Sequence, residues 1–157
     1  MNDLKVRKIQ KNDLEVIINL LADDDLGQFR ETKSNVIHAD YIRAFEQINS
    51  DANQYAAVFE SYGEIVGCLQ ITFIPGFSRH GCLRGQIEGV RVSRDFRGKG
   101  YGTKMINWAI SECRDRGCGM VQLTSDKKRE NAIQFYEKLG FEKSHEGLKL
   151  NLASVLG

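Results

Sequence analysis

Three alternating glycines between basic side chains carry the clearest chemical signal in the chain, in the run Arg97-Gly98-Lys99-Gly100-Tyr101-Gly102. The segment before it, 86–92, has the pattern of a strand, and the segment after it, 101–116, that of an amphipathic helix. A glycine-rich turn that opens a helix directs unpaired N–H groups and the positive end of the helix dipole at one place. This arrangement suits an anionic group, so the sequence predicts a site for a phosphate-bearing ligand.

Two common glycine signatures do not fit this run. The dinucleotide pattern G-x-G-x-x-G can start at Gly98, but Thr103 occupies its third glycine position. The P-loop pattern needs Ser or Thr after Gly-Lys, and here Gly100 follows Lys99. What remains is the pattern R-x-x-G-x-G, which begins at Arg97 and leads into the predicted helix.

A second block lies about thirty residues downstream, with the sequence Glu130-Asn131-Ala132-Ile133-Gln134-Phe135-Tyr136-Glu137-Lys138-Leu139-Gly140-Phe141. With both blocks on suitable elements, the chain resembles the GNAT superfamily of acetyl-CoA-dependent N-acetyltransferases, most closely from Ile87 to Phe141. The resemblance implies an α/β (α+β) GNAT acyl-CoA N-acyltransferase fold. Its central sheet would be mixed and mostly antiparallel, with about seven strands, about four flanking helices and a splayed parallel pair at the cofactor slot.

The resemblance also implies which residues hold acetyl-CoA. The glycine-rich segment would wrap the pyrophosphate, through Arg97, Gly98, Lys99, Gly100, Tyr101, Gly102 and Thr103. Lys99 alone is equally well explained as a surface residue. The strand residues Val90, Arg91 and Val92 would pair their backbone with the pantetheine arm, and an N–H near Val90 would polarise the thioester carbonyl. The simpler interpretation of these three residues is a core strand.

Three further residues are candidates for chemistry. In the family a tyrosine at the place of Tyr136 protonates the leaving thiolate, although here it could be a packing residue; a phenol of pKa ~10 suits a thiolate of pKa ~8.5 modestly. Asn131 would hold the cofactor arm, act as a helix N-cap, or do both. Glu88, beside Gly89 on its strand, is the candidate general base that deprotonates the attacking ammonium, against the alternative of an exposed strand residue.

The acceptor is predicted less closely than the donor. We expect the acceptor to be a primary amine of a small molecule or peptide. The amine would attack the thioester directly, without an acetyl-enzyme intermediate. An acidic loop with two nearby charged residues could attract such an amine or could simply be solvated: Asp23, Asp24, Asp25, Arg30 and Glu31. Arg84, His80 and His145 are further candidates. The alternatives to an acetyltransferase are an acyl-CoA-binding sensor or regulatory module without turnover, and an enzyme for longer acyl-CoA donors.

Periodicity places the elements that must position these residues. Strands are predicted at 4–10, 55–61, 65–74, 82–92, 120–124, 141–145 and 148–152, and helices near 13–21, 35–48, 101–116 and 131–139. Gly89 predicts a bulge in its strand or a close approach by another group, and Gly140 predicts a left-handed helix end with Phe141 folded back on the last turn. The segment 86–124 is a βαβ unit and therefore predicts two parallel strands.

Bulk properties narrow the class of protein. The length of 157 residues, without low-complexity segments, predicts one domain, 1–157. A net charge of +1 gives no general attraction to nucleic acid or an anionic membrane, and no bilayer-spanning run or secretory signal is present. The cysteines, 68, 82, 113 and 118, lack metal-ligand spacing and favour reduced core thiols in the cytoplasm. No metal site is expected, and homodimerisation is an expectation from the family alone.

Overall fold

The computed structural model describes residues 4–23, 27–29, 31 and 37–153 of the chain. The chain divides into two compact units, Met1–Leu123 and Thr124–Gly157, and each is treated by itself below. Within the described ranges, the first unit contains all of the strands, and the second contains the helix α5 (Glu130–Lys138). Three of the charged residues predicted near the acceptor, Asp24, Asp25 and Arg30, lie outside the described residues.

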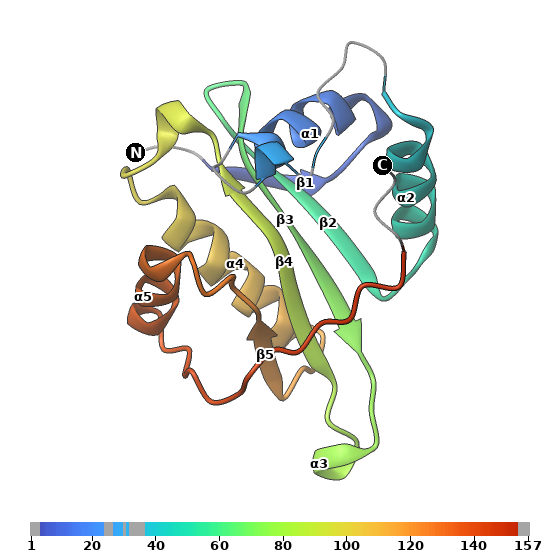
Figure 1. Cartoon of the computed structure of the whole chain (residues 1–157), viewed down its shortest axis with the longest axis vertical. Helices are drawn as coiled ribbons and strands as arrows, with labels where there is room; N and C mark the ends of the chain where they lie inside the picture. The colour runs from blue at the N-terminus through green and yellow to red at the C-terminus, as the bar shows by residue number, and fades with distance from the viewer. Residues whose placement is uncertain (1–3, 24–26, 30, 32–36, 154–157) are drawn as a thin grey trace. The chain divides into compact units, whose positions relative to one another are not determined.

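A five-stranded mixed sheet forms the centre of the first unit, with the strands in the order of the sequence (Figure 1). The strands are β1 (Lys5–Lys8), β2 (Gln54–Ser61), β3 (Glu64–Ile74), β4 (Arg84–Val92) and β5 (Met120–Leu123). The pairs from β1 to β4 are antiparallel, whereas β4 and β5 are parallel. The predicted α/β class and the parallel pair are therefore confirmed, with each of these strands within two residues of its predicted bounds.

The helix α4 (Tyr101–Asp115) packs its apolar stripe against one face of the sheet. Its core side chains Met105, Ile106 and Ala109 are fully buried, as are Phe59 and Ile71 of the strands they cover. Trp108 meets the rings of Tyr55 and Phe59 edge-on at 5.3 and 5.4 Å. This face is the main hydrophobic core, and it fixes the helix whose first turn follows the glycine run.

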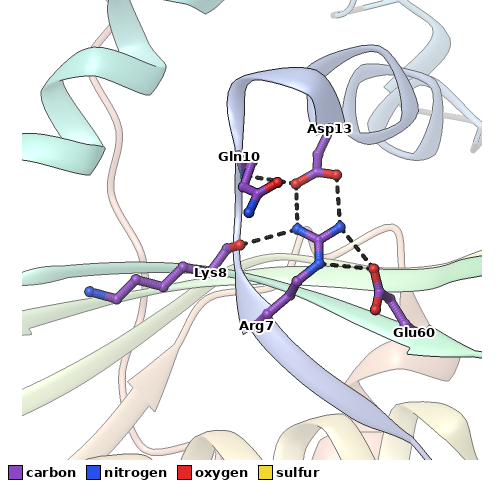
Figure 2. A network of polar contacts seen from close by, with 5 residues as sticks. All are labelled: Arg7, Lys8, Gln10, Asp13 and Glu60. Atoms are coloured by element: carbon purple, nitrogen blue, oxygen red, sulfur yellow. Dashed lines mark hydrogen bonds and ion pairs between the residues drawn. The ribbon is translucent and has the colours of Figure 1, made fainter.

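The helix α1 (Leu14–Ala22) covers part of the opposite face, where Leu20 packs with Val58 and Cys68. A polar network at its start ties it to the sheet (Figure 2). Arg7 of β1 binds Asp13 through two hydrogen bonds of 2.7 and 3.0 Å, and its Nε donates to Glu60 of β2 at 2.9 Å. These bonds lower the pKa of the Asp13 carboxyl, which is 7% exposed.

The remaining helices of the first unit are α2 (Ala39–Ser50), predicted at 35–48, and the four-residue α3 (Ser78–Gly81) in the loop between β3 and β4. Residues 35 and 36 of the predicted α2 lie outside the described residues. Short 3-10 turns stand at Lys11–Asp13, Gly27–Phe29 and Arg94–Phe96. The hairpin between β2 and β3 turns at Tyr62 and Gly63, whose φ of 54° and 79° are both in the left-handed region that two-residue hairpin turns use.

In the second unit, α5 ends as the sequence predicts. Gly140 has φ 94°, Phe141 N–H donates to the Tyr136 carbonyl at 3.1 Å, and the rings of these two residues meet at 5.8 Å. The two strands predicted at 141–145 and 148–152 are wrong, so the sheet has five described strands and not about seven. Leu148, Leu150 and Leu152 alternate as strand residues do, but they are 84–93% exposed, and an alternating pattern forms a strand only where another strand accepts its hydrogen bonds.

Candidate active site

Strand β4 bulges where the sequence predicts it and then continues beyond its parallel neighbour. The register with β3 shifts between the pairs Cys68↔Arg91 and Gln70↔Glu88, and Gly89 has φ 62°. Pairing with β5 ends at Ile87↔Leu123. The segment 88–92 therefore extends past the last residue of β5, next to the bulge.

Two arginine side chains bind the backbone of this segment. Arg91 Nη1 donates to the Val90 carbonyl at 2.8 Å, and Arg97 Nε donates to the Val92 carbonyl at 3.0 Å. Val90, Arg91 and Val92 are each half-buried. The segment is thus held at its carbonyl groups by the side chains of the chain itself.

The glycine run forms an open loop ahead of α4. Gly98 and Gly100 have φ of 72° and 83°, and no atom lies within 4 Å of a Cβ built on either. Gly100 is the N-cap of α4 and supplies no side-chain bond to it; the first helical bond runs from Lys104 N–H to the Gly100 carbonyl at 3.3 Å. The N–H groups of the first turn, at Tyr101, Gly102 and Thr103, precede that bond, as an anion site requires.

The basic side chains of the loop bind the protein backbone. Lys99 Nζ donates to the Asp95 carbonyl at 2.8 Å and lies 5.6 Å from the Phe96 ring centre. Arg97 Nη2 donates to the Asp23 carbonyl at 2.9 Å. The side chain of Tyr101 is buried, with its hydroxyl 3.1 Å from Ser61 Oγ, so Tyr101 presents only its backbone to the loop. In this arrangement the binding of an anion by the loop would depend mainly on backbone N–H groups.

The end of α1 is joined to this loop by an arginine pair. Asp23, the C-cap of α1, accepts a hydrogen bond of 2.7 Å from Arg94 and lies 3.7 Å from Arg97. Its charge is therefore paired within the protein. Glu31, the other described residue of the predicted acidic group besides Asp23, accepts a hydrogen bond of 2.6 Å from the Tyr41 hydroxyl. Sequence reasoning missed the Asp23 pairing, because a contact across more than 70 positions leaves no local pattern.

Glu88 is exposed on β4 beside the bulge, on the sheet face that α1 partly covers. Leu21 of α1 approaches this point, 3.8 Å from a Cβ built on Gly89. Cys68 lies on that face, with its Sγ 3.6 Å from the Gly89 carbonyl oxygen. Burial raises the pKa of this thiol to about 12, so the thiolate that a covalent mechanism needs is disfavoured.

The second unit holds Tyr136 and Asn131 on α5. Tyr136 is half-buried between two aromatic rings, with Phe135 at 5.1 Å and Phe141 at 5.8 Å. Asn131 is exposed, and the prediction that it is the N-cap is wrong: the N-cap is Arg129. The turn before the helix sets this start, since Asp126 accepts hydrogen bonds from the N–H groups of Lys128 and Arg129.

The other candidates are spread over the two units. Arg84 of β4 donates to Gln122 of β5 at 3.4 Å, whereas His80 lies in the exposed turn of α3 with φ 58°. His145 of the second unit lies 2.7 Å from Ser144 Oγ. Within the described ranges, no three His, Cys, Asp or Glu side chains converge on a possible metal position. The described helices are all too short or too polar to cross a bilayer.

The fold is a mixed α/β sheet whose parallel pair ends near the glycine loop at the start of α4, and comparison with known proteins assigns it to the acyltransferases. The model of the acetyltransferase (GNAT) family matches residues 16–141, and the chain belongs to this family. Glucosamine 6-phosphate N-acetyltransferase of Trypanosoma brucei brucei is 31% identical over 147 residues, which cover 89% of this chain and 97% of that protein.

Two solved structures illustrate the likeness of fold. A protein of Bacillus halodurans C-125, described as a transcriptional regulator, has 43% identity and a TM-score of 0.92, with 96% of this chain and 100% of that chain covered. A predicted acetyltransferase of Clostridium acetobutylicum, crystallised with acetyl-CoA, has 21% identity and a TM-score of 0.72, with 96% and 97% covered. The second comparison supports the fold alone.

Proposed function

We propose that this acetyltransferase transfers the acetyl group of acetyl-CoA directly to a primary amine of a small molecule or peptide. The observation that carries the proposal is the open loop from Gly98 to Gly102 at the start of α4, next to the segment of β4 that extends past β5. The loop would offer backbone N–H groups to the pyrophosphate, and the part of β4 at 90–92, which lies beyond its pairing with β5, would pair with the pantetheine arm.

Chemistry in this proposal needs one base and one acid. Glu88, beside the bulge, takes the proton from the ammonium, directly or through water, so that the neutral amine attacks the thioester carbonyl. A backbone N–H near Val90 stabilises the oxyanion, and the Tyr136 phenol protonates the departing thiolate. The raised pKa of Cys68 supports direct attack without an acyl-cysteine intermediate.

The amine is proposed to be small, as in relatives such as glucosamine 6-phosphate N-acetyltransferase, with which this chain aligns over most of its length. A second role is favoured by one observation, namely that the 43% identical relative is described as a transcriptional regulator. In that role the site would bind acyl-CoA as a signal, without turnover. Release of free CoA in the presence of amines distinguishes the two roles.

The test of the donor site is a pair of matched glycine variants. Gly100→Glu and Gly63→Glu each place the same side chain on a left-handed residue with open space around it, so both cost about 1–2 kcal/mol of stability. Only Gly100→Glu brings a negative charge to the start of α4. Calorimetric titration with acetyl-CoA is expected to show binding to wild type and Gly63→Glu, and none to Gly100→Glu. Equal binding to both variants would refute the loop assignment.

A further inference from the structure

A strip of polar side chains runs across the sheet face on which Glu88 lies. We define this polar strip by six residues of four neighbouring strands: Gln54, Gln70, Thr72, Arg84, Gln86 and Gln122. Directly opposed residues of antiparallel strands point to the same face, and the pairs Gln70↔Glu88 and Thr72↔Gln86 therefore place the strip next to Glu88. All six side chains are half-buried.

The polarity of the strip contrasts with the rest of the sheet. On the opposite face the corresponding positions are apolar and nearly inaccessible, for example Ile71, Phe73 and Ile87. On the face of the strip itself, Val58 and Cys68 form an apolar cluster with α1, and the next pair along the strands, Ala56↔Gln70, brings the first polar side chain. Because β3 and β4 each pair on both sides, the polar groups do not serve to protect a sheet edge.

Hydrogen bonds hold the strip in order. Gln54 Oε1 accepts from Gln70 Nε2 and from Thr72 Oγ1, both at 2.9 Å, and Gln122 Nε2 donates to Gln86 Oε1 at 2.7 Å. A carboxamide has two N–H donors and two lone pairs, so these bonds leave each glutamine with further hydrogen-bonding capacity in a fixed orientation. At its β2 end the strip adjoins a hollow of about 270 Å³, lined in part by Gln54, Ala56 and Ile48.

We infer that the polar strip binds the body of the acceptor and that the acceptor is a primary amine carrying several hydroxyl groups. This inference rests on the proposed function, in which Glu88 receives the proton of the amine. Along β4 the strip extends about 7 Å from Glu88 to Gln86 and about 13 Å to Arg84, enough for a sugar-sized molecule. The carboxamides, the Thr72 hydroxyl and the Arg84 guanidinium are hydrogen-bonding partners for hydroxyl groups, whereas an apolar amine would leave them without a ligand partner.

Two nearly isosteric variants test the inference, Thr72→Val and Gln86→Leu, with Gln47→Leu on the exposed surface of α2 as the control. Release of CoA is measured with glucosamine and with cyclohexylamine, which has a six-membered ring but no hydroxyl group. Each strip variant is expected to lower kcat/KM for glucosamine about tenfold, as the loss of one hydrogen bond predicts, and to change that for cyclohexylamine less than about twofold. For each amine, kcat/KM of the variant is divided by that of the wild type, which cancels the different basicity of the two amines.

Equal losses with both amines, or no loss with glucosamine, would overturn the inference. So would a wild-type protein that binds acetyl-CoA but acetylates neither amine. Calorimetry and CoA release with a wider set of amines separate this failure from a failure of the proposed function: the proposed function fails if acetyl-CoA does not bind or if no amine releases CoA. Unchanged KM for acetyl-CoA and unchanged urea unfolding in each variant exclude a general structural effect.

Discussion

The packing between β4 and the end of α4 gives a sharp prediction about Gly85. A Cβ built on Gly85 would lie 2.3 Å from the sulfur of Cys113, which is fully buried. The helix end holds that sulfur in place: Gly117 has φ 82°, and Cys118 N–H donates to the Cys113 carbonyl at 2.9 Å. Gly85→Ala is therefore expected to cost about 1–3 kcal/mol of unfolding free energy, the usual cost of overpacking a core.

The same geometry predicts that a second substitution removes this cost. In the Cys113→Ala background the nearest atoms to the new methyl group are the Cβ of residue 113 at 3.4 Å and Cys118 Sγ at 3.8 Å, both ordinary contacts. Gly85→Ala then becomes stabilising by about 0.5–1 kcal/mol, since alanine has less freedom in the unfolded chain. The coupling between the two sites is the difference between these two effects, about 1.5–4 kcal/mol.

Urea unfolding of the wild type, the two single variants and the double variant, followed by circular dichroism, measures this coupling. Gly67 provides the control, because a Cβ there would lie 2.6 Å from Met105 sulfur and also 2.8 Å from the backbone carbonyl of Arg91. Met105→Ala leaves that carbonyl in place and is expected to rescue Gly67→Ala much less. Additivity at Gly85 and Cys113 within about 0.5 kcal/mol would refute the packing argument.

Three further predictions concern the polar groups. Asp13→Asn should lower the unfolding free energy by about 1–3 kcal/mol at pH 7. Because Arg7 lowers the pKa of Asp13, this difference between wild type and variant persists above pH ~4 and narrows as the pH falls through the lowered pKa. Acid unfolding of both proteins measures it. Tyr136→Phe should lower kcat about tenfold or more with little change in acetyl-CoA affinity, and unchanged turnover would remove the acid role. Glu88→Gln should flatten the acidic limb of the pH–rate profile, and a profile identical to that of the wild type would leave another group as the base.

Local patterns were sufficient for the elements that carry their own signal. The strand 65–74, the bulge at Gly89 and the helix end at Gly140 each depend on alternation or on a left-handed glycine, and the structure has all three. The segment 148–152 shows the limit of this reasoning. Its leucines alternate as clearly as those of a strand, but pairing depends on a partner that the segment itself does not encode.

In the candidate site, too, some features follow from the local sequence and others depend on the tertiary fold. The backbone geometry of the glycine loop follows from residue type, because Gly98 and Gly100 alone in that loop have positive φ. The contacts of its side chains do not follow from residue type. Arg97 is of the type expected for a phosphate ligand, yet its side chain binds the Val92 and Asp23 carbonyls. Those partners come from β4 and from the end of α1, and only the tertiary fold brings them together.

This use of Arg97 has a consequence for how the first unit would bind its ligands. One guanidinium joins the end of β4, the C-cap residue of α1 and the start of the glycine loop. Since Leu21 of α1 also approaches the bulge at Gly89, a shift of α1 would change the geometry at both the proposed thioester position and the proposed pyrophosphate position. Asp23→Asn, which keeps the carbonyl acceptor but removes the charge, should therefore weaken acetyl-CoA binding less than Arg97→Ala does. A larger effect of Asp23→Asn in calorimetric titration would show that the ion pair, and not the backbone bonds, holds the loop.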